Sequence, residues 1–513
     1  MNRRIYIIGV AALLCSGSLQ AQERHLLDSL HYRAELQATV ASGDHAPLWL
    51  NANKYGMSSL KTTNGFLRAA LARPLSLDNG RKWGVGYGID AAVAAGFTST
   101  LVLQQAYVEG RWLKGVLSVG AKEQPMELKN PELSSGAQAL GINARPVPSV
   151  RLSLPDYWAI PFTRGWLSLK GHIAYGKTTD GKWQKDFVSD NNRYTEGTLL
   201  HTKAGYLKIG PKNITLELGL EMASQFGGKS YYDINNDGQR EVIENAAGLK
   251  AFWHAFVPGG SGADEVGSDY RNSEGNQLGS WVARLNIDQP SWYLGLYADH
   301  FFEDHSSMFM LDYNGYGQGQ EWDTRKDRRY FLYDLKDIML GAELKLKRIP
   351  WLNDIVVEYL YTKYQSGPVY HDHSPYISSH LGGRDDYYNH HIFTGWQHWG
   401  QVMGNPLYRS PLYNDNGSIR VTDNRFVAWH LGVSGQPLAP LHYRFLATYQ
   451  TGLGTYADPL PGRHYNLSLL AEASWRFPHD WMVRGALAMD KGRLLGDNYG
   501  FQLSIIKTGI LAK

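Results

Sequence analysis

Residues 464–490, HYNLSLLAEASWRFPHDWMVRGALAMD, decide the fold class of this chain of 513 residues. Apolar and polar side chains alternate from 464 to 477, and the alternation resumes at Trp481 after a short link. A period of two is the mark of a β-strand with one apolar face and one polar face. Each run is also long enough to cross a bilayer at a tilt, for which about 9 to 11 residues suffice.

The same alternation recurs along most of the chain and gives about eighteen predicted strands. An even number of antiparallel strands is typical of single-chain barrels in bacterial outer membranes. The predicted strands span residues 32–42, 64–76, 82–96, 101–112, 114–122, 147–155, 165–176, 198–209, 213–226, 279–287, 291–301, 336–348, 354–365, 425–436, 441–451, 464–477, 480–491 and 498–510.

The links between these strands alternate between short and long. Outer-membrane barrels have short periplasmic turns and long external loops, whereas a soluble β-sandwich would not sort its links in this way. No fixed-period repeat indicates a solenoid or a propeller. Tryptophans near the ends of the runs suit the interfacial girdles of a barrel, although buried tryptophans would look similar: Trp83, Trp112, Trp166, Trp281, Trp292 and Trp481. The long links are 43–63, 123–146, 177–197, 227–278, 302–335 and 366–424.

We therefore predict an all-β fold, a transmembrane antiparallel up-and-down barrel of about 18 strands whose long extracellular loops fold partly over or into the lumen. Residues 1–21 have the pattern of an export signal, with two arginines, an apolar run and a small residue before the expected cleavage site. Residues 22–31 would then form a short lead-in, and 32–513 would form a single barrel domain in the outer membrane.

Composition excludes several other classes of protein. Tyrosine and glycine are abundant, with 32 and 55 residues, which favours a β chain over a disordered chain or a helical array. The formal net charge of +3 counts Arg3 and Arg4, which lie in the expected leader, so the mature chain is nearly neutral. A charge this small gives no indication of nucleic-acid binding. The single cysteine, Cys15, lies in the same leader, which excludes disulfides and thiolate sites from the mature chain. A lipoprotein cleavage box at Cys15 is disfavoured because bulky Leu14 precedes it.

Four stretches carry a resemblance to a known family. They read ASGDHAPLWLNANKYG (41–56), ELSSGAQALGINARPVPSVRLSLPDYWAIPFTRGWLSLKG (132–171), DHFFEDHSSMF (299–309) and GGRDDYYNHHIFTGWQHWGQVMGNPLYRSPLY (382–413). None of them is a generic strand or turn pattern. They resemble the Bacteroidetes branch of the Wzi family of capsule-assembly proteins, and the resemblance spans nearly the whole mature chain.

The resemblance implies an outer-membrane barrel of about 18 strands that helps to attach capsular polysaccharide to the cell surface without catalysis. It also implies capsular or surface polysaccharide, outer-membrane lipids and the capsule export machinery as partners. Enterobacterial members carry a periplasmic helical bundle before the barrel, whereas here only residues 22–31 precede the first strand. Any function tied to that bundle is therefore not expected.

The segment DINNDGQREVIE in the loop 227–278 resembles a calcium-binding loop. Such loops need oxygen ligands at alternate positions, a glycine for the bend and a bidentate glutamate at the twelfth position. Arg240 stands where an apolar residue is usual, and a solvated turn is the alternative interpretation. No cofactor is required, and the predicted ligands of a structural Ca²⁺ are Asp233, Asn235, Asp237, Gln239 and Glu244.

The longest loop, 366–424, is rich in histidine and aromatic residues. Three interpretations stay open: a plug that fills the lumen, a platform on which sugar rings stack, and a transition-metal site built from imidazoles. The histidines are His371, His373, His380, His390, His391 and His398. The predicted polysaccharide-binding residues are Trp396, Trp399, Tyr387, Tyr388, Arg384 and His390.

Sequence motifs for catalysis are scarce. No zinc-protease helix, nucleophile elbow or phosphate loop is present. His305 and Ser307, with Glu303 or Asp304 to orient the histidine, are similar to the pair of outer-membrane lipid A deacylases, but a local cluster at the barrel rim is the favoured interpretation. We therefore predict a non-enzymatic protein that binds polysaccharide in the manner of a lectin. The alternative is a porin-like diffusion channel for small solutes.

Overall fold

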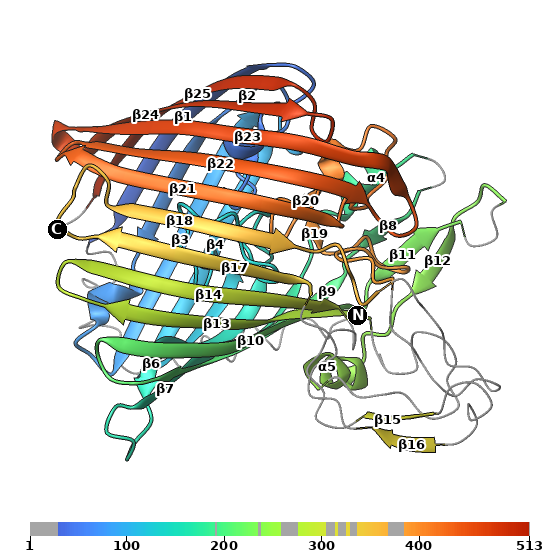
Figure 1. Cartoon of the computed structure of the whole chain (residues 1–513), viewed down its shortest axis with the longest axis horizontal. Coiled ribbons are helices and arrows are strands. Elements are labelled where there is room, and N and C mark those ends of the chain that lie inside the picture. The colour runs from blue at the N-terminus through green and yellow to red at the C-terminus, as the bar shows by residue number, and fades with distance from the viewer. Residues whose placement is uncertain are drawn as a thin grey trace, which may run out of the picture.

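The structure is a closed barrel of eighteen antiparallel strands (Figure 1). This computed structural model describes residues 29–189, 192–233, 237–257, 275–303, 313–316, 325–328, 336–367 and 384–511. The barrel strands are β1 (His31–Ser42), β2 (Thr63–Arg73), β3 (Trp83–Ala95), β4 (Leu101–Trp112), β5 (Gly115–Ala121), β6 (Ser149–Ala159), β7 (Leu167–Lys177), β9 (Leu199–Ile209), β10 (Ile214–Phe226), β13 (Asn276–Asp288), β14 (Trp292–Glu303), β17 (Ile338–Leu346), β18 (Asp354–Tyr361), β21 (Phe426–Leu438), β22 (Leu441–Gly454), β23 (Pro459–Phe477), β24 (Trp481–Gly492) and β25 (Asn498–Ile510).

The predicted fold class is confirmed, and every predicted strand overlaps one strand of the barrel. Each strand pairs with its neighbour along the chain, and β1 pairs with β25 from His31 opposite Ile510 to Ser42 opposite Tyr499. This last ladder leaves the sheet without a free edge, as a bilayer requires. The short turns lie together at the left end of the barrel in Figure 1, and the long loops lie at the right end.

The alternation in the sequence separates the two faces of the barrel wall. Leu36 and Val40 of β1 point outward and are more than half exposed, whereas Glu35, Gln37 and Thr39 point into the lumen and are buried. An apolar band of this kind matches lipid acyl chains. At the end with the short turns, exposed aromatic rings include Trp83, Trp112, Trp166 and Trp481, as expected of an interfacial girdle.

Smaller sheets and helices lie in the long loops. A second sheet joins β8 (Tyr194–Glu196), β11 (Lys229–Tyr232) and β12 (Glu241–Glu244), and two further pairs are β15 (Tyr313–Tyr316) with β16 (Arg325–Arg328) and β19 (Gln397–His398) with β20 (Gln401–Val402). In the described part of the chain, the helices are α3 (Leu48–Asn51), α4 (Gly181–Phe187) and α5 (Leu249–Phe256). A short 3-10 turn at Pro411–Tyr413 lies at the end with the long loops too, whereas those at Leu75–Asp78 and Pro478–Asp480 lie in short links at the opposite end. Among the described residues, none of the helices has the length and apolar character needed to span a bilayer.

The lumen of the barrel is filled by loops that fold inward from the end with the long loops. We call the segments 43–62, 122–148 and 384–425 together the plug. The largest buried cluster joins plug residues such as Trp49, Leu133 and Trp396 to lumen-facing wall residues such as Val356 and Ala428. An 18-stranded barrel is wide enough for an aqueous channel. The expectation that the loops fold into the lumen is therefore confirmed, and these loops supply the core.

Candidate functional site

Carboxylates on the lumen side of the wall hold the plug in place. Glu358 of β18 is fully buried and accepts hydrogen bonds from the backbone N–H of Ser135 at 2.8 Å, from the Ser134 hydroxyl, and from the Tyr297 hydroxyl at 2.6 Å. Asp299 of β14 accepts hydrogen bonds from Lys129 Nζ at 2.7 Å and from a plug backbone N–H. Asp299 balances the charge of Lys129, and both carboxylates accept hydrogen bonds from buried donors of the plug, as buried polar groups require.

The aromatic residues of the longest loop form the middle of the plug. Tyr388 and Tyr408 stack with ring centroids 4.0 Å apart, and Phe301 of β14 packs edge-on against Tyr387 at 4.7 Å. The Tyr388 hydroxyl donates to the carbonyl of Gln138 and accepts from a backbone N–H, and burial raises its pKa well above the ordinary value. These rings face other parts of the chain, and the lumen-plug interpretation therefore describes them.

This burial corrects the expectation of an exposed platform. Tyr387, Tyr388 and Trp396 are buried, and Trp396 Nε1 donates a hydrogen bond of 2.8 Å to the carbonyl of Ala139. The sequence left the plug and the sugar platform open, because an aromatic loop that binds sugar and one that fills a barrel have the same composition. A ring in this position stabilises the plug and has no face free for a sugar.

Trp399 lies at the edge of the plug and is partly exposed. The Arg145 guanidinium stacks on its ring at 4.3 Å from the centroid, while Trp399 Nε1 donates to the Thr179 hydroxyl at 3.2 Å. The backbone N–H of Trp399 donates to Asp180, and His398 Nδ1 donates to the carbonyl of Arg145 at 2.8 Å. Burial lowers the pKa of Arg145 to about 10, which still leaves it charged at neutral pH. The stacked pair therefore joins three separate stretches of the chain.

The other predicted binding residues lie apart from Trp399. Arg384 is exposed, and His390 is partly buried with its Nδ1 accepting hydrogen bonds from the backbone N–H groups of Ile392 and Phe393. His371, His373 and His380 lie outside the described residues, as do His305, Ser307 and Asp304. Within the described ranges, no group of three His, Cys, Asp or Glu side chains is arranged to hold a metal ion.

The described part of the calcium-like segment comprises Asp233 and residues 237–244, the last four of which form β12. Asp233 accepts hydrogen bonds from the backbone N–H groups of Asp237 and Gly238, at 3.0 and 2.8 Å, and Asp237 accepts one from the backbone N–H of Gln239. Glu244 pairs with Lys229 of β11 at 2.7 Å. Asn235 lies outside the described residues, so calcium binding by this segment stays a prediction.

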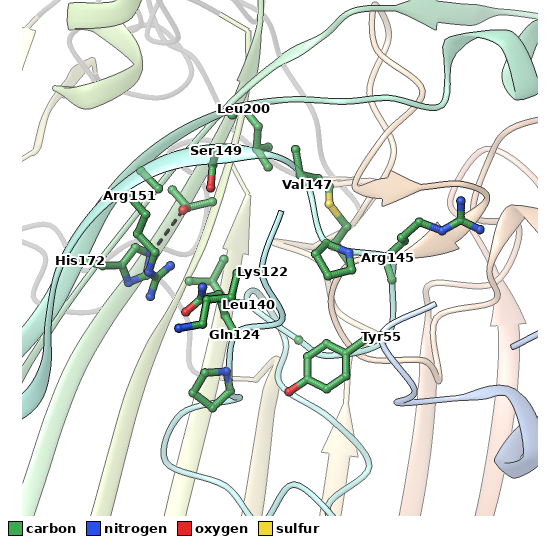
Figure 2. Close-up of a pocket in the computed structure, with 18 of the residues that line it drawn as sticks. Tyr55, Lys122, Gln124, Leu140, Arg145, Val147, Ser149, Arg151, His172 and Leu200 are labelled. Carbon is green, nitrogen blue, oxygen red and sulfur yellow. Dashed lines mark hydrogen bonds between the residues drawn. The ribbon is translucent and has the colours of Figure 1, made fainter. Parts of the chain in front are cut away.

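A cavity of about 150 Å³ lies between the plug and the lumen side of β6, β7 and β9 (Figure 2). The wall contributes Ser149 and Arg151 of β6 and His172 of β7, whose Nε2 lies 3.3 Å from the Thr202 hydroxyl. The plug contributes polar side chains at Lys122, Gln124 and Glu127 and apolar ones at Leu140, Val147 and Met403. The sequence analysis did not single out these residues. Their only signal is a charged residue, Arg151, on the polar face of a predicted strand.

This chain matches one protein family and is similar in structure to several outer-membrane barrels. A family model for the capsule assembly protein Wzi matches residues 8–322. No curated protein matches the chain. Among solved structures, the Escherichia coli outer-membrane protein Wzi, described as involved in group 1 capsule assembly and as a carbohydrate-binding β-barrel, is 13% identical, with a TM-score of 0.54 over 94% of this chain and 84% of that one. This likeness shows a shared barrel fold. Pseudomonas aeruginosa OccD3 is 10% identical, with a TM-score of 0.43 over 94% of this chain and 91% of that one.

Proposed function

Because this chain belongs to the Wzi family of capsule assembly proteins, we propose that it retains capsular polysaccharide at the cell surface by non-covalent binding. The barrel lies in the outer membrane, and its apolar wall suits contact with outer-membrane lipids. Binding, without catalysis, is the whole of the proposed activity. Contact with the capsule export machinery stays a prediction, which cross-linking in intact cells would test.

The observation that carries the proposal is the filled lumen beneath the extracellular loops. A plug tied to the wall at Glu358 and Asp299 gives the external end of the barrel a fixed surface, and fixed surfaces bind polymers with a smaller loss of conformational entropy. On that surface, Trp399 offers a partly exposed aromatic ring, held in place by the buried Arg145 guanidinium, and sugars pack against such rings. Weak contacts of this kind add through avidity when many barrels meet one repeating chain.

The filled lumen also disfavours the alternative function, a porin-like diffusion channel. Solute flow through a porin requires an aqueous path along the whole lumen, whereas here Tyr388, Trp396 and Tyr408 pack across the lumen against wall residues. We expect the purified barrel to show little conductance in planar bilayers. Large open-channel steps would favour the channel.

The test of the proposed function is a strain that lacks the gene, compared with the same strain carrying it on a plasmid. Cell-bound and shed polysaccharide are measured separately. We expect shed polymer to rise while the total stays normal, because retention and not synthesis depends on this barrel. Unchanged retention would contradict the proposal, and a fall in the total would point to a role in synthesis or export.

A further inference from the structure

The cavity between the plug and the wall contains an arginine whose guanidinium has no hydrogen-bond or ion-pair partner among the described residues. Arg151 of β6 points toward His172 and the plug residue Lys122 (Figure 2). Its guanidinium makes no hydrogen bond or ion pair with any residue that the structure describes, although its five N–H groups can all donate. Arg151 is partly buried, and the carboxylate whose charge acts on it is Glu127. A partly buried guanidinium whose N–H groups have no acceptor is costly. Its presence here therefore calls for a partner from outside the chain.

The other charges around the cavity are already paired. Lys122 Nζ forms an ion pair with Glu109 of β4, and Glu127 forms one with Lys170 of β7. The Arg145 side chain points away from the cavity, toward Trp399. Glu127 attracts Arg151 electrostatically, but its carboxylate is already paired with Lys170, so Arg151 adds a positive charge to the cavity without a direct ion pair. A carboxylate or other oxyanion would compensate it.

Two neutral groups can complete the binding of an oxyanion. The Gln124 side chain from the plug and the Ser149 hydroxyl from β6 both line the cavity, and neither has a side-chain hydrogen bond to another described residue. An amide N–H and a hydroxyl O–H can donate to the same oxyanion that the guanidinium fork holds in a bidentate manner. The three groups line one cavity from two sides, the plug and the wall, and are therefore the candidate donors to one anion bound there.

The rest of the cavity suits a sugar that carries the anion. Leu140, Val147 and Leu200 give it an apolar side, and a volume of about 150 Å³ exceeds the roughly 10 to 15 Å³ that a single water needs. Ser149 is the first residue of β6 and pairs with Gly176 near the end of β7, so the cavity lies in the extracellular part of the lumen. The C–H faces of a pyranose ring can pack against the apolar side while its substituent reaches Arg151.

We propose that this cavity binds an acidic sugar of the surface polymer, with a uronic acid carboxylate held by Arg151, Gln124 and Ser149. This inference rests on the proposed function and names the class of sugar that the site selects. The Arg fork favours planar carboxylates and also accepts phosphate or sulfate. The experiment must therefore separate these sources of negative charge.

The test measures binding of sodium glucuronate, glucose, inorganic phosphate and oligogalacturonate to the purified full-length barrel by titration calorimetry at low and high salt. We expect the uronates to bind more tightly than glucose, and high salt to weaken them. Arg151→Gln should weaken uronate binding about tenfold to a hundredfold, as loss of a charge-assisted hydrogen bond does. Arg151→Lys should retain part of the affinity, because it keeps the charge and loses the fork.

Several results would overturn the inference. Equal binding of glucose and glucuronate, no uronate binding at all, or phosphate binding alone would each do so, as would unchanged affinity in Arg151→Gln. If Arg151→Gln does not fold, Gln124→Ala and Ser149→Ala provide the same comparison, and both should lose affinity. Failure here leaves capsule retention by the wild-type protein intact, so it is distinguishable from failure of the proposed function.

Discussion

Removing the carboxylate of Glu358 should detach part of the plug from the barrel wall. This carboxylate joins β18 to the plug through the Ser134 hydroxyl and the backbone N–H of Ser135, and it also accepts the Tyr297 hydroxyl of β14. Hydrogen bonds to charged groups contribute about 1.5 to 3 kcal/mol each. The two bonds to the plug therefore give Glu358→Ala an expected loss of about 3 to 6 kcal/mol in the local attachment of residues 133–136.

A loss of this size has a measurable consequence in hydrogen exchange. Since about 1.4 kcal/mol is a factor of ten in an equilibrium constant, the amide of Ser135 should exchange about a hundredfold to ten-thousandfold faster in Glu358→Ala. Exchange of backbone amides reports such local opening directly. The effect should stay local, because Lys129 remains paired with Asp299 and His430 Nε2 remains 2.8 Å from the carbonyl of Leu133.

Glu35→Ala is the matched control. Glu35 also faces the lumen and is buried, but its carboxylate bonds Arg33 of the same strand. Exchange at 133–136 should then match the wild type, and heat-modifiable migration on gels should show a folded barrel in both variants. If Ser135 exchanges at the wild-type rate in Glu358→Ala, or equally fast in both variants, the wall carboxylate does not hold the plug.

Four further predictions follow from single contacts. Burial raises the pKa of Asp423 to about 7, above its ordinary value of 3.8. The stability that the protonated carboxyl contributes is therefore complete below about pH 4 and lost as pH rises through 7, so the protection factors of amides near 423–424, corrected for base-catalysed intrinsic exchange, should fall from pH 4 to 8, and Asp423→Asn should abolish that fall. A Cβ at Gly432 would lie 2.4 Å from the Leu133 carbonyl oxygen, so Gly432→Ala should destabilise the plug by about 1 to 3 kcal/mol in exchange experiments, whereas Gly485→Ala, with open space at its Cβ, should not. Trp399→Ala removes the ring on Arg145 and should lower cell-bound polymer while the barrel still folds; wild-type retention would make this stacked pair purely structural. Calcium bound by Asp233, Asp237 and Glu244 should slow limited proteolysis of the loop 227–278, and equal cleavage with and without chelator, or in Asp237→Ala, would indicate a plain turn.

The strands could be predicted from the sequence because their pattern is local. Along β23 and β24, each residue faces either lipid or lumen according to its place in an alternation of two, and the short link at 478–480 sets the pairing of Phe477 with Trp481. The lengths of the links then assign each end of the barrel to one side of the membrane. The four stretches that resemble a family added the functional class, which the family match over 8–322 confirms.

The site could be predicted only in part, because the sequence does not say which faces of a loop become buried. Trp396 and Trp399 are three residues apart in one aromatic loop, yet Trp396 is bonded to Ala139 inside the plug while Trp399 stacks on Arg145 at its edge. Their partners lie more than 250 residues away in the chain. No periodicity links such distant segments.

The sequence by itself determined the barrel, its strand number, its orientation and its family. Only the tertiary structure decided that three loops fold in to fill the lumen and that Arg151 lines a cavity without a hydrogen bond or ion pair to a described residue. The physical reason is the range of the interactions. Strand alternation is imposed on each residue by its nearest neighbours and the solvent on each face, whereas the plug is held by buried contacts such as Glu358 with Ser135, whose existence depends on where two remote segments meet.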